Sequence, residues 1–364
     1  MQKRKIAFIL CVNDEVYYQE CLFYINRLRL PEGFEAEVYP VRQATSIYQG
    51  YQQAMEQSDA EYKVYLHQDV FLIYPEFLLE MVKLFEKHPQ ARLAGVMGAS
   101  AVSTERRFYR SWDIGNVIGC SEKKAFTNEL NKDEAKVQIL DGMLLMTKVD
   151  LPWRAEALGG WDFYDISQSL EFGEAGYEIW IPAQGQPWCI HDCGMLNLTG
   201  YDDAQEEFLK IYGHKLPDYS GQPAVYPPDY RKRFALMMEI KEQWKSLLFL
   251  GRIAEVEEMM VKLGDERFFD TETAILKNIL EILKEESAAG VAKEQGFLYD
   301  CGSFAQANRK YLQIKFWLRR RVYAPDAAGL CPDVSTVAKQ VVERHTMTDA
   351  GSHANGLIHL ENGG

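Results

Sequence analysis

The chain has 364 residues, of which 47% are hydrophobic and 26% are charged, a composition that excludes a mainly disordered protein. A single hydrophobic core stops growing near roughly 250–300 residues, so this length predicts one large domain with an appendage. Forty Lys and Arg residues against 53 Asp and Glu residues leave a formal charge of −13. This acidic balance argues against broad electrostatic binding to nucleic acid, and no nucleic-acid partner is predicted.

The N-terminal segment and the cysteines bear on cellular location. Residues Ile6–Val12 form a short apolar run that leads directly into polar residues, without the small-residue cleavage site of a secretory signal. No later stretch approaches the roughly 18 uncharged apolar residues of a membrane span. The seven cysteines are scattered and contain no CxxC pair. We therefore expect reduced thiols and a cytoplasmic location.

Strands and amphipathic helices alternate along the first hundred residues. Apolar and β-branched runs predict strands at Lys5–Val12, Glu37–Val41, Lys63–Leu66 and Arg92–Gly98. Apolar residues at helical spacing predict helices at Glu15–Leu30, Ala44–Gln57 and Pro75–Lys87. This alternation indicates an α/β fold, with a mostly parallel sheet flanked by crossover helices. In such sheets ligands bind at the carboxyl ends of the strands.

The pattern changes after the fourth predicted strand. Residues 101–136 are polar and contain an aromatic and basic cluster, which suggests a long excursion or flap. Val137–Thr147 is expected to return as one strand, Asp162–Gly173 as a helix and Tyr177–Pro182 as another strand. The α/β domain is expected to occupy residues 1–205.

The C-terminal part has a different composition. Helical spacing with glycine breaks predicts a small helical domain over residues 206–325, and a Gly-rich, polar composition predicts a weakly ordered tail over 326–364. Residues 309–323 carry six cations and no acid, with aromatic residues between the charges. Aromatic packing on the α/β domain and docking on an anionic membrane surface both account for this pattern.

Two histidines and an aspartate follow predicted strands. His67 and Asp69 come directly after Lys63–Leu66, and residues two apart in an extended segment point to the same side, so both can face one ion. His191, within Trp188–Cys193 at the end of another predicted strand, can complete the set. Imidazole with carboxylate suits Mn²⁺ better than Mg²⁺. A turn capped by Asp69 explains the same pattern without a ligand, and the lack of a second cysteine pair disfavours zinc.

Two acidic residues mark the start of the helix predicted at Asp162–Gly173. In a structural interpretation Asp162 caps the helix and Asp165 lies in its first turn, where the positive helix end favours acids. In a functional interpretation Asp162 is a general base. A carboxylate has enough lone pairs to do both.

In order and spacing these segments resemble a family 2-type glycosyltransferase of the GT-A fold. More narrowly, they resemble the glycosyltransferase-like branch that includes streptomycin-biosynthesis relatives. The resemblance covers roughly residues 5–200. The segments that carry it are Tyr65–Val70, Leu140-Asp141-Gly142, Pro152-Trp153-Arg154, Gly160–Ser167 and Pro187–Gly194. It implies a GT-A (Rossmann-like) fold, a nucleotide-diphosphate sugar as donor, and a glycan, lipid-linked or protein acceptor.

The resemblance also implies roles for individual positions. Asp69 takes the place of the second Asp of the metal- and diphosphate-binding DxD motif, and His67 stands where the first Asp is usual. His191 takes the place of a late metal-binding His. The family usually has adjacent Glu-Asp at the helix start, with the Asp as base; Asp162 is favoured here, with Asp165 as the alternative. The implied nucleotide-sugar contacts are Asn13, Asp14, Ser46, Gln52, Asp69, Asp141 and Gly142.

These residues predict a divalent-metal-dependent glycosyltransferase. One carboxylate deprotonates the acceptor hydroxyl and one cation stabilises the leaving diphosphate. No second carboxylate is placed as a nucleophile, so direct displacement with inversion is expected. Because His67 replaces an Asp, an inactive GT-A-fold nucleotide-sugar-binding or scaffold protein is one alternative. A metal-dependent hydrolase is another. Peripheral contact with the inner face of the membrane would run through residues 309–323.

Overall fold

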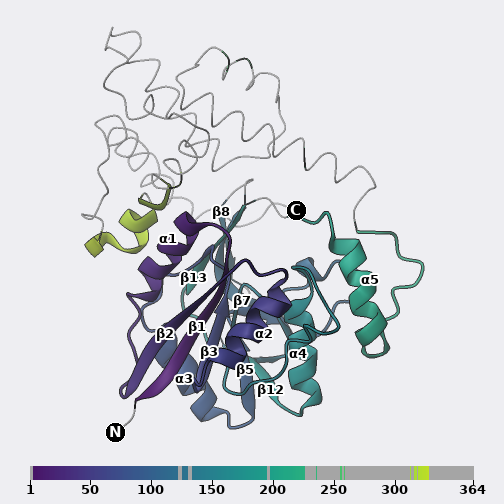
Figure 1. Cartoon of the computed structure of the whole chain (residues 1–364), viewed down its shortest axis with the longest axis horizontal. Helices are drawn as coiled ribbons and strands as arrows, with labels where there is room; N and C mark the ends of the chain where they lie inside the picture. The colour runs from purple at the N-terminus through teal and green to yellow at the C-terminus, as the bar shows by residue number, and fades with distance from the viewer. Residues whose placement is uncertain are drawn as a thin grey trace. The chain divides into compact units, whose positions relative to one another are not determined.

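The computed structural model describes residues 3–121, 125–129, 133–194, 197–225, 235, 255, 258, 312, 315–317 and 319–327. The chain divides into two compact units, one formed by Met1–Ser121 with Ala125–Arg231 and the other by Glu122–Lys124 with Lys232–Gly364. Most of the helical domain expected over 206–325, and nearly all of the tail expected over 326–364, lie outside the described residues. The elements described below belong to the first unit (Figure 1).

The larger sheet has seven strands in the order β2-β1-β3-β11-β5-β12-β9. These strands are β1 (Arg4–Val12), β2 (Phe34–Arg42), β3 (Tyr62–Leu66), β5 (Ala91–Gly95), β9 (Ala135–Val137), β11 (Leu144–Thr147) and β12 (Glu178–Ile181). Strands β1, β2, β3, β5 and β12 share one direction, and β9 and β11 run against it. The predicted mostly parallel α/β sheet is therefore confirmed.

A second sheet of six strands follows the order β10-β6-β7-β13-β4, with β8 paired to β7. Its strands are β4 (Val70–Leu72), β6 (Met97–Ala99), β7 (Ile114–Ser121), β8 (Ala125–Glu129), β10 (Ile139–Leu140) and β13 (Cys189–Gly194). The expectation of a flap over 101–136 is wrong, because this stretch supplies the central strand β7. One of its polar residues is bonded from far along the chain: the backbone N–H of buried Asn116 donates to the Gln184 side chain at 2.6 Å. Because Gln184 is 68 positions from Asn116 in the sequence, this contact could not be predicted from neighbouring residues.

Two predicted strands are each divided between the sheets. Arg92–Gly98 is β5 followed by β6, and Val137–Thr147 is β9, β10 and β11. The chain passes between the sheets at residues 67–69, at Val96 and at residues 141–143. At the last of these, Oδ1 of Asp141 accepts the Met143 N–H at 2.9 Å. That side-chain turn bends the backbone, so one apolar run forms separate strands.

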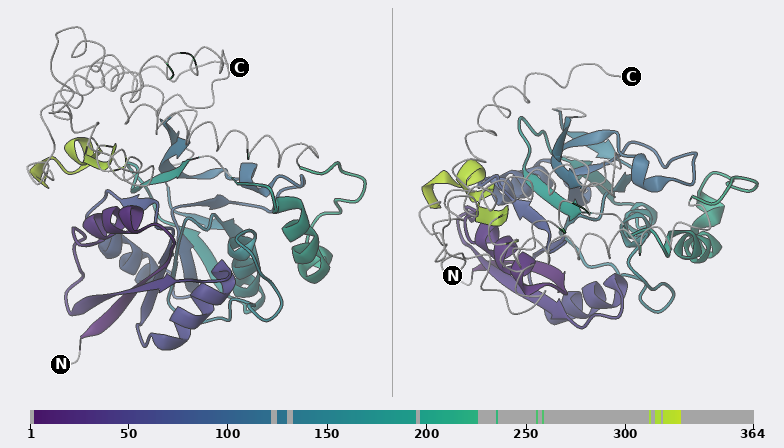
Figure 2. Two further views of the ribbon diagram at one scale, coloured as in Figure 1. Left: turned by 45° about the horizontal axis from the view of Figure 1, so that its top comes forward. Right: turned by 90° about the horizontal axis from the view of Figure 1, so that it is seen from above.

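Helices cover both faces of the larger sheet (Figure 2). The helices of this unit are α1 (Glu15–Ile25), α2 (Ile47–Gln57), α3 (Phe77–Lys87), α4 (Tyr164–Glu174) and α5 (Tyr201–Tyr212), with 3₁₀ turns at Phe108–Arg110 and Gly213–Lys215. A further 3₁₀ turn, Pro325–Ala327, belongs to the second unit. Tyr62 and Tyr65 on β3 point to opposite faces, as residues three apart on a strand must. Helix α3 packs on the Tyr62 face through Phe85, and α2 packs on the Tyr65 face through Tyr51.

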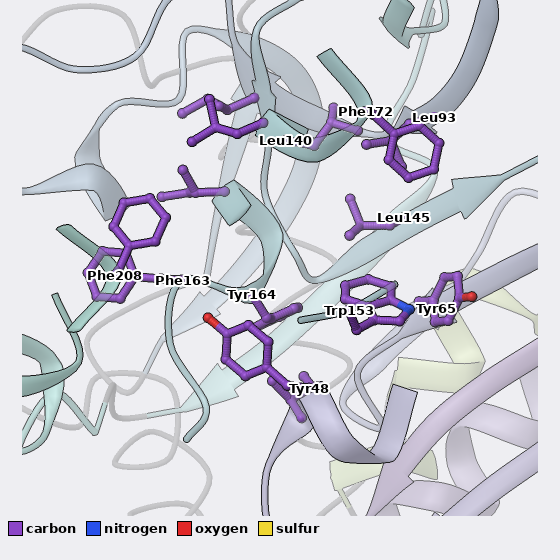
Figure 3. Packing of buried hydrophobic residues seen from close by; sticks show 14 of the residues in the cluster. Tyr48, Tyr65, Leu93, Leu140, Leu145, Trp153, Phe163, Tyr164, Phe172 and Phe208 are labelled. Atoms are coloured by element: carbon purple, nitrogen blue, oxygen red, sulfur yellow. The ribbon is translucent and has the colours of Figure 1, made fainter. Parts of the chain in front are cut away.

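An aromatic core underlies the start of α4 (Figure 3). Trp153 is 1% exposed, and its ring centroid lies 4.7 Å from that of Tyr65 and 4.9 Å from that of Tyr51. Tyr164 joins the same cluster, 5.9 Å from Tyr51. Aromatic pairs of this kind contribute about 0.5–1.5 kcal/mol each beyond the area they bury. This packing of aromatic rings fixes the position of the start of α4.

Two expectations from the sequence, reduced cysteines and the lack of a membrane span, can be compared with the described residues. Cys11, Cys21, Cys189 and Cys193 are thiols with no disulfide between them, as predicted for the part of the chain described. None of the helices in the described residues combines the length and the apolar composition that crossing a bilayer requires.

Candidate active site

Three predicted ligands lie together where the chain leaves the larger sheet. Nδ1 of His67 is 3.8 Å from Oδ1 of Asp69, and Nε2 of His191 is 3.9 Å from the same oxygen. One ligand atom from each of the three side chains lies within 4.8 Å of the others. We call His67, Asp69 and His191 the strand-end cluster.

Strand pairing explains why His191 reaches Asp69. Strand β4 begins at Val70, and β13 pairs with it antiparallel so that His191 lies opposite Val70. The Asp192 N–H donates to the Asp69 carbonyl at 2.9 Å, and the His67 N–H donates to the Met143 carbonyl at 3.1 Å. The backbone register of two sheets therefore places the strand-end cluster.

Tyr164 orients the first histidine of this cluster. Its hydroxyl is hydrogen-bonded to Nε2 of His67, which leaves Nδ1 facing Asp69. Burial lowers the pKa of His67, so the imidazole is neutral at pH 7, the form that binds metal. When Nδ1 coordinates an ion, the ring proton sits on Nε2 and is donated to the Tyr164 oxygen. The donor set of two imidazoles and a carboxylate therefore fits a divalent cation.

Gly142 is the residue over which Tyr164 lies. A Cβ at position 142 would overlap the Tyr164 hydroxyl and ring, so no larger residue fits without displacing them. The Gly142 N–H donates to Oδ2 of Asp165 at 2.8 Å. Gly142 thus allows a close approach between the turn at 141–143 and the first turn of α4.

The start of α4 differs from the prediction. The helix begins at Tyr164 and not at Asp162, and the flanking residue is Phe163, with φ 62° and no side-chain cap. The expected cap by Asp162 is therefore wrong. The ring of Phe163 packs against those of Phe208 at 5.0 Å and Tyr201 at 4.8 Å. This packing holds Phe163 in the left-handed region, so the chain enters α4 through a sharp bend after Asp162.

The two carboxylates at this helix start differ in their partners. Asp165, in the first turn as expected, accepts the Ile166 N–H through Oδ1 and the Gly142 N–H through Oδ2, each at 2.8 Å. Burial, with the charge of Asp141, raises the pKa of Asp165 to about 7. Among the described residues none donates a hydrogen bond to the Asp162 carboxylate, and burial raises its pKa to about 6. Asp162 is the carboxylate left available for chemistry.

Asn13 and Asp14 lie beside the strand-end cluster through Gln68. Oε1 of Gln68 accepts both of their backbone N–H groups at 3.0 Å, and its amide donates to the Asn13 side chain. Oδ1 of Asp14 also caps α1, accepting from Val16 and Tyr17. Gln68 was not among the predicted site residues, because the extended segment expected there would turn it away from its two neighbours. The structure has a turn instead, in which the Val70 N–H donates to the His67 carbonyl at 3.1 Å.

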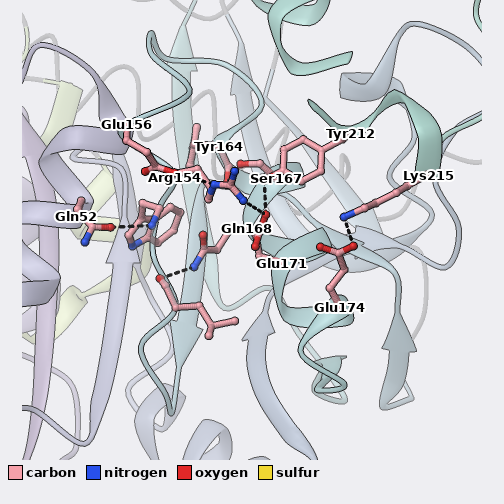
Figure 4. Close-up of polar contacts among 12 residues, drawn as sticks. Gln52, Arg154, Glu156, Tyr164, Ser167, Gln168, Glu171, Glu174, Tyr212 and Lys215 are labelled. Carbon is pink, nitrogen blue, oxygen red and sulfur yellow. Dashed lines mark hydrogen bonds and ion pairs between the residues drawn. The ribbon is translucent and has the colours of Figure 1, made fainter. Parts of the chain in front are cut away.

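Ser46 and Gln52 have structural partners on α2. Ser46 caps this helix by accepting the Gln49 N–H, and Gln52 accepts the Trp153 N–H at 2.8 Å (Figure 4). Helix α2 also holds the segment before α4, since the Tyr48 hydroxyl donates to the Asp162 carbonyl at 2.9 Å. Ser46 and Gln52 therefore support the site, and nucleotide contact by either stays a prediction.

Fold and site together define an α/β protein with a candidate metal centre, which Tyr164 links to the helix start that carries the candidate base. Residues 7–212 match the family described as Glycosyltransferase like family. This match covers more than half of the chain. The chain therefore belongs to the glycosyltransferase-like family.

Other comparisons add resemblance only. No curated protein matches the sequence significantly. Among solved structures, the chain is similar to the mannosyltransferase PcManGT from Pyrobaculum calidifontis in complex with GDP-Man and Mn²⁺, with 13% identity, a TM-score of 0.38, and coverage of 91% of this chain and 88% of that one. It is also similar to A197 from STIV, with 12% identity, a TM-score of 0.29, and coverage of 50% and 82%. At these scores neither likeness bears on function.

Proposed function

We propose that this chain transfers a sugar from a nucleoside-diphosphate donor to an acceptor hydroxyl, with a divalent cation and with inversion at the anomeric carbon. One observation carries the proposal. Asp162, whose carboxylate accepts no hydrogen bond from the described residues, is two residues from Tyr164, whose hydroxyl contacts His67 of the strand-end cluster. Glycosyl transfer needs a base for the acceptor and a positive charge for the leaving diphosphate, and Tyr164 connects the segment that carries the first to the cluster that would hold the second.

Asp162 supplies the base in this proposal. Its carboxylate takes the proton of the acceptor hydroxyl while the acceptor oxygen bonds to the anomeric carbon and the bond to the diphosphate breaks. A pKa of about 6 leaves Asp162 ionised at pH 7 and more basic than an ordinary aspartate. Both Asp165 oxygens accept backbone N–H groups, which disfavours Asp165 as base or nucleophile. Direct displacement by a single base inverts the anomeric carbon.

The strand-end cluster would hold the cation. When bound, the cation stabilises the charge of the diphosphate leaving group. Two imidazole donors favour Mn²⁺ over Mg²⁺. The chain's own contribution is a desolvated, neutral His67 that Tyr164 keeps in one orientation.

Donor contacts extend from this cluster toward the end of β1. Asn13 and Asp14 are the strongest candidates, since Gln68 ties their backbone to the segment between His67 and Asp69. Asp141 and Gly142 would act beside them, because Coulombic interaction links Asp141 with His67. Ser46 and Gln52 would act through the packing of α2.

Acceptor class and cellular location are finer parts of the proposal. We expect a glycan, lipid-linked or protein acceptor, a cytoplasmic enzyme, and membership of the branch that includes streptomycin-biosynthesis relatives.

The basic segment 309–323 is the candidate for membrane contact. The structure describes its residues 312, 315–317 and 319–323. Lys315 and Phe316 are buried, and the Arg321 guanidinium lies 5.2 Å from the Trp317 ring centroid. Contact with an anionic membrane would rest on residues 319–321. Salt-sensitive sedimentation with anionic vesicles, lost on changing these three arginines to Glu, tests it.

Turnover by the full chain is the direct test. We would incubate it with UDP- and GDP-sugars, with Mn²⁺, Mg²⁺ or EDTA, and with a panel of acceptors. The expected result is metal-dependent transfer, with a product of inverted anomeric configuration. Tight nucleotide binding without turnover on any donor would instead support the scaffold alternative. Rapid sugar release that no acceptor changes would support the hydrolase.

A further inference from the structure

Trp161 is the residue immediately before the proposed base, and its side chain is 51% exposed. Among the described residues the other large hydrophobic side chains with comparable exposure are Leu30, at 43%, and Val322, at 51%. Leaving an indole in water forgoes the favourable free energy of burying it. An exposed Trp beside a functional carboxylate therefore points to a ligand.

The backbone around Trp161 is held on both sides. The Ile47 N–H donates to the Gly160 carbonyl at 3.0 Å, and the Tyr48 hydroxyl donates to the Asp162 carbonyl at 2.9 Å. Gly160 has φ 81°, a left-handed conformation that glycine adopts without strain. The chain thus presents the indole from an anchored turn. A side chain with two rotatable bonds on an anchored backbone loses little entropy when a ligand covers it.

The position of Asp162 indicates which ligand this is. If Asp162 removes the acceptor proton, the acceptor hydroxyl must come within hydrogen-bond reach of its carboxylate. Trp161 is the next residue in the chain and its indole is exposed, so the ring that carries this hydroxyl would come within reach of the indole. A pyranose ring has a face of C–H groups that packs on an aromatic plane, while its hydroxyls project from the ring edge.

We infer that Trp161 is the platform of an acceptor subsite that takes a pyranose ring, stacked by its C–H face on the indole with one hydroxyl toward Asp162. This inference rests on the proposed function. It assigns the acceptor class as one that ends in a pyranose, whether on a glycan, a lipid or a protein. Asp162 is the proposed catalytic residue, and Trp161 binds the acceptor.

Steady-state kinetics on the full chain separate acceptor binding from donor use. Trp161→Ala should raise the acceptor KM about tenfold, since a good aromatic contact is worth about one decade of affinity. Donor KM and donor hydrolysis should stay within about twofold of wild type, and Trp161→Phe should recover most of the acceptor affinity. Leu30→Ala is the matched control, because Leu30 is similarly exposed but precedes β2, at the opposite end of the parallel strands. An unchanged acceptor KM in Trp161→Ala would overturn the inference, and so would an equal loss of donor hydrolysis.

A binding measurement keeps this inference distinct from the proposed function. Saturation-transfer NMR with methyl glycosides of glucose, galactose, mannose and N-acetylglucosamine, in both anomeric forms, needs no turnover. For at least one glycoside the ring protons of one face should receive saturation from wild type and Leu30→Ala, and lose it in Trp161→Ala. If no glycoside shows this dependence, the subsite is wrong even when transfer occurs. If the glycosides bind through Trp161 but no donor is ever used, the proposed transferase activity is wrong.

Discussion

The strand ends and the start of helix α4 both bring functional groups to the candidate site, but they position them differently. At the strand ends, backbone pairing between β4 and β13 sets His191 opposite Val70, beside Asp69. At the helix start, Phe163 adopts a left-handed conformation, and the carbonyls of Gly160 and Asp162 are held by α2.

This difference separates residues proposed only to bind from residues that also support the fold. The side chains of the strand-end cluster carry little of the fold, because sheet hydrogen bonds persist when a side chain is changed. At the helix start, Asp165 satisfies two backbone N–H groups, whereas none of the described residues donates a hydrogen bond to the Asp162 carboxylate. Two aspartates three positions apart should therefore differ in how turnover and stability respond to the same substitution.

The largest expected effect is at Asp162. Asp162→Asn should lower kcat by about 10²- to 10⁴-fold, the usual contribution of a general base, with a smaller change in donor KM. It should also raise Tm. Burial raises the pKa of Asp162, so its ionised form costs stability as pH rises from the unfolded-state pKa through about 6, and Asn removes that cost. Turnover and thermal melts at pH 7 measure both.

Asp165→Asn is the matched control for that variant. Asn offers one side-chain oxygen to two backbone N–H groups, which costs about 1–3 kcal/mol in unfolding free energy. It also removes a carboxylate whose pKa burial raises to about 7, which offsets part of that cost, so the Tm of Asp165→Asn should stay below that of Asp162→Asn. The kcat of the folded protein should change less than it does in Asp162→Asn. If Asp165→Asn abolishes turnover and Asp162→Asn leaves it intact, the base is Asp165.

The next effect in size concerns the strand-end cluster. Asp69→Asn and His191→Ala should each weaken metal-dependent donor binding about 100-fold with little change in Tm, because each removes one of three converging donors. Calorimetric titration with Mn²⁺ and with nucleoside diphosphate measures both affinities without requiring turnover. Cys193→Ser, two residues after His191 on the same strand, is the control. Unchanged Mn²⁺ affinity in both cluster variants would exclude a shared ion.

A glycine that joins the two regions should show a smaller effect. Gly142→Ala places a methyl group against the Tyr164 hydroxyl, so either Tyr164 or the turn must shift, at a cost of about 1–3 kcal/mol in unfolding free energy. Gly173→Ala, in α4 with open space around its Cβ position, should instead stabilise by about 0.5–1 kcal/mol. Chemical denaturation compares them. Equal stability of the two variants would mean that Tyr164 does not need its close approach to Gly142.

The last prediction concerns the pH dependence of turnover, where each pH unit changes kcat by at most about tenfold. The base acts when ionised, so kcat should rise with pH, reach half its maximum near pH 6 and then level off, falling about tenfold per unit below that point. The profile is measured at saturating donor, acceptor and metal. A midpoint near 4, the ordinary value for aspartate, would indicate that Asp162 is solvated in the reacting complex.

Local sequence patterns were sufficient for much of the α/β framework. Apolar runs and helical spacing located β1, β3, α2 and α3, because strand and helix periodicities depend on neighbouring residues. The same alternation placed His67 and Asp69 on one side of the chain after β3. The family segments around these residues also pointed to the glycosyltransferase-like family.

Tertiary structure decided the rest, because it depends on contacts between distant segments. The hydrogen bond between Tyr164 and His67 joins residues 97 positions apart, and no local pattern encodes it. The pairing of β13 with β4 brings His191 to Asp69, and pairing with β6, β8 and β13 makes β7 a strand within the stretch expected as a flap. Burial and partners distinguish Asp162 from Asp165, since both are ordinary aspartates until the fold removes water from them and gives backbone donors to one alone.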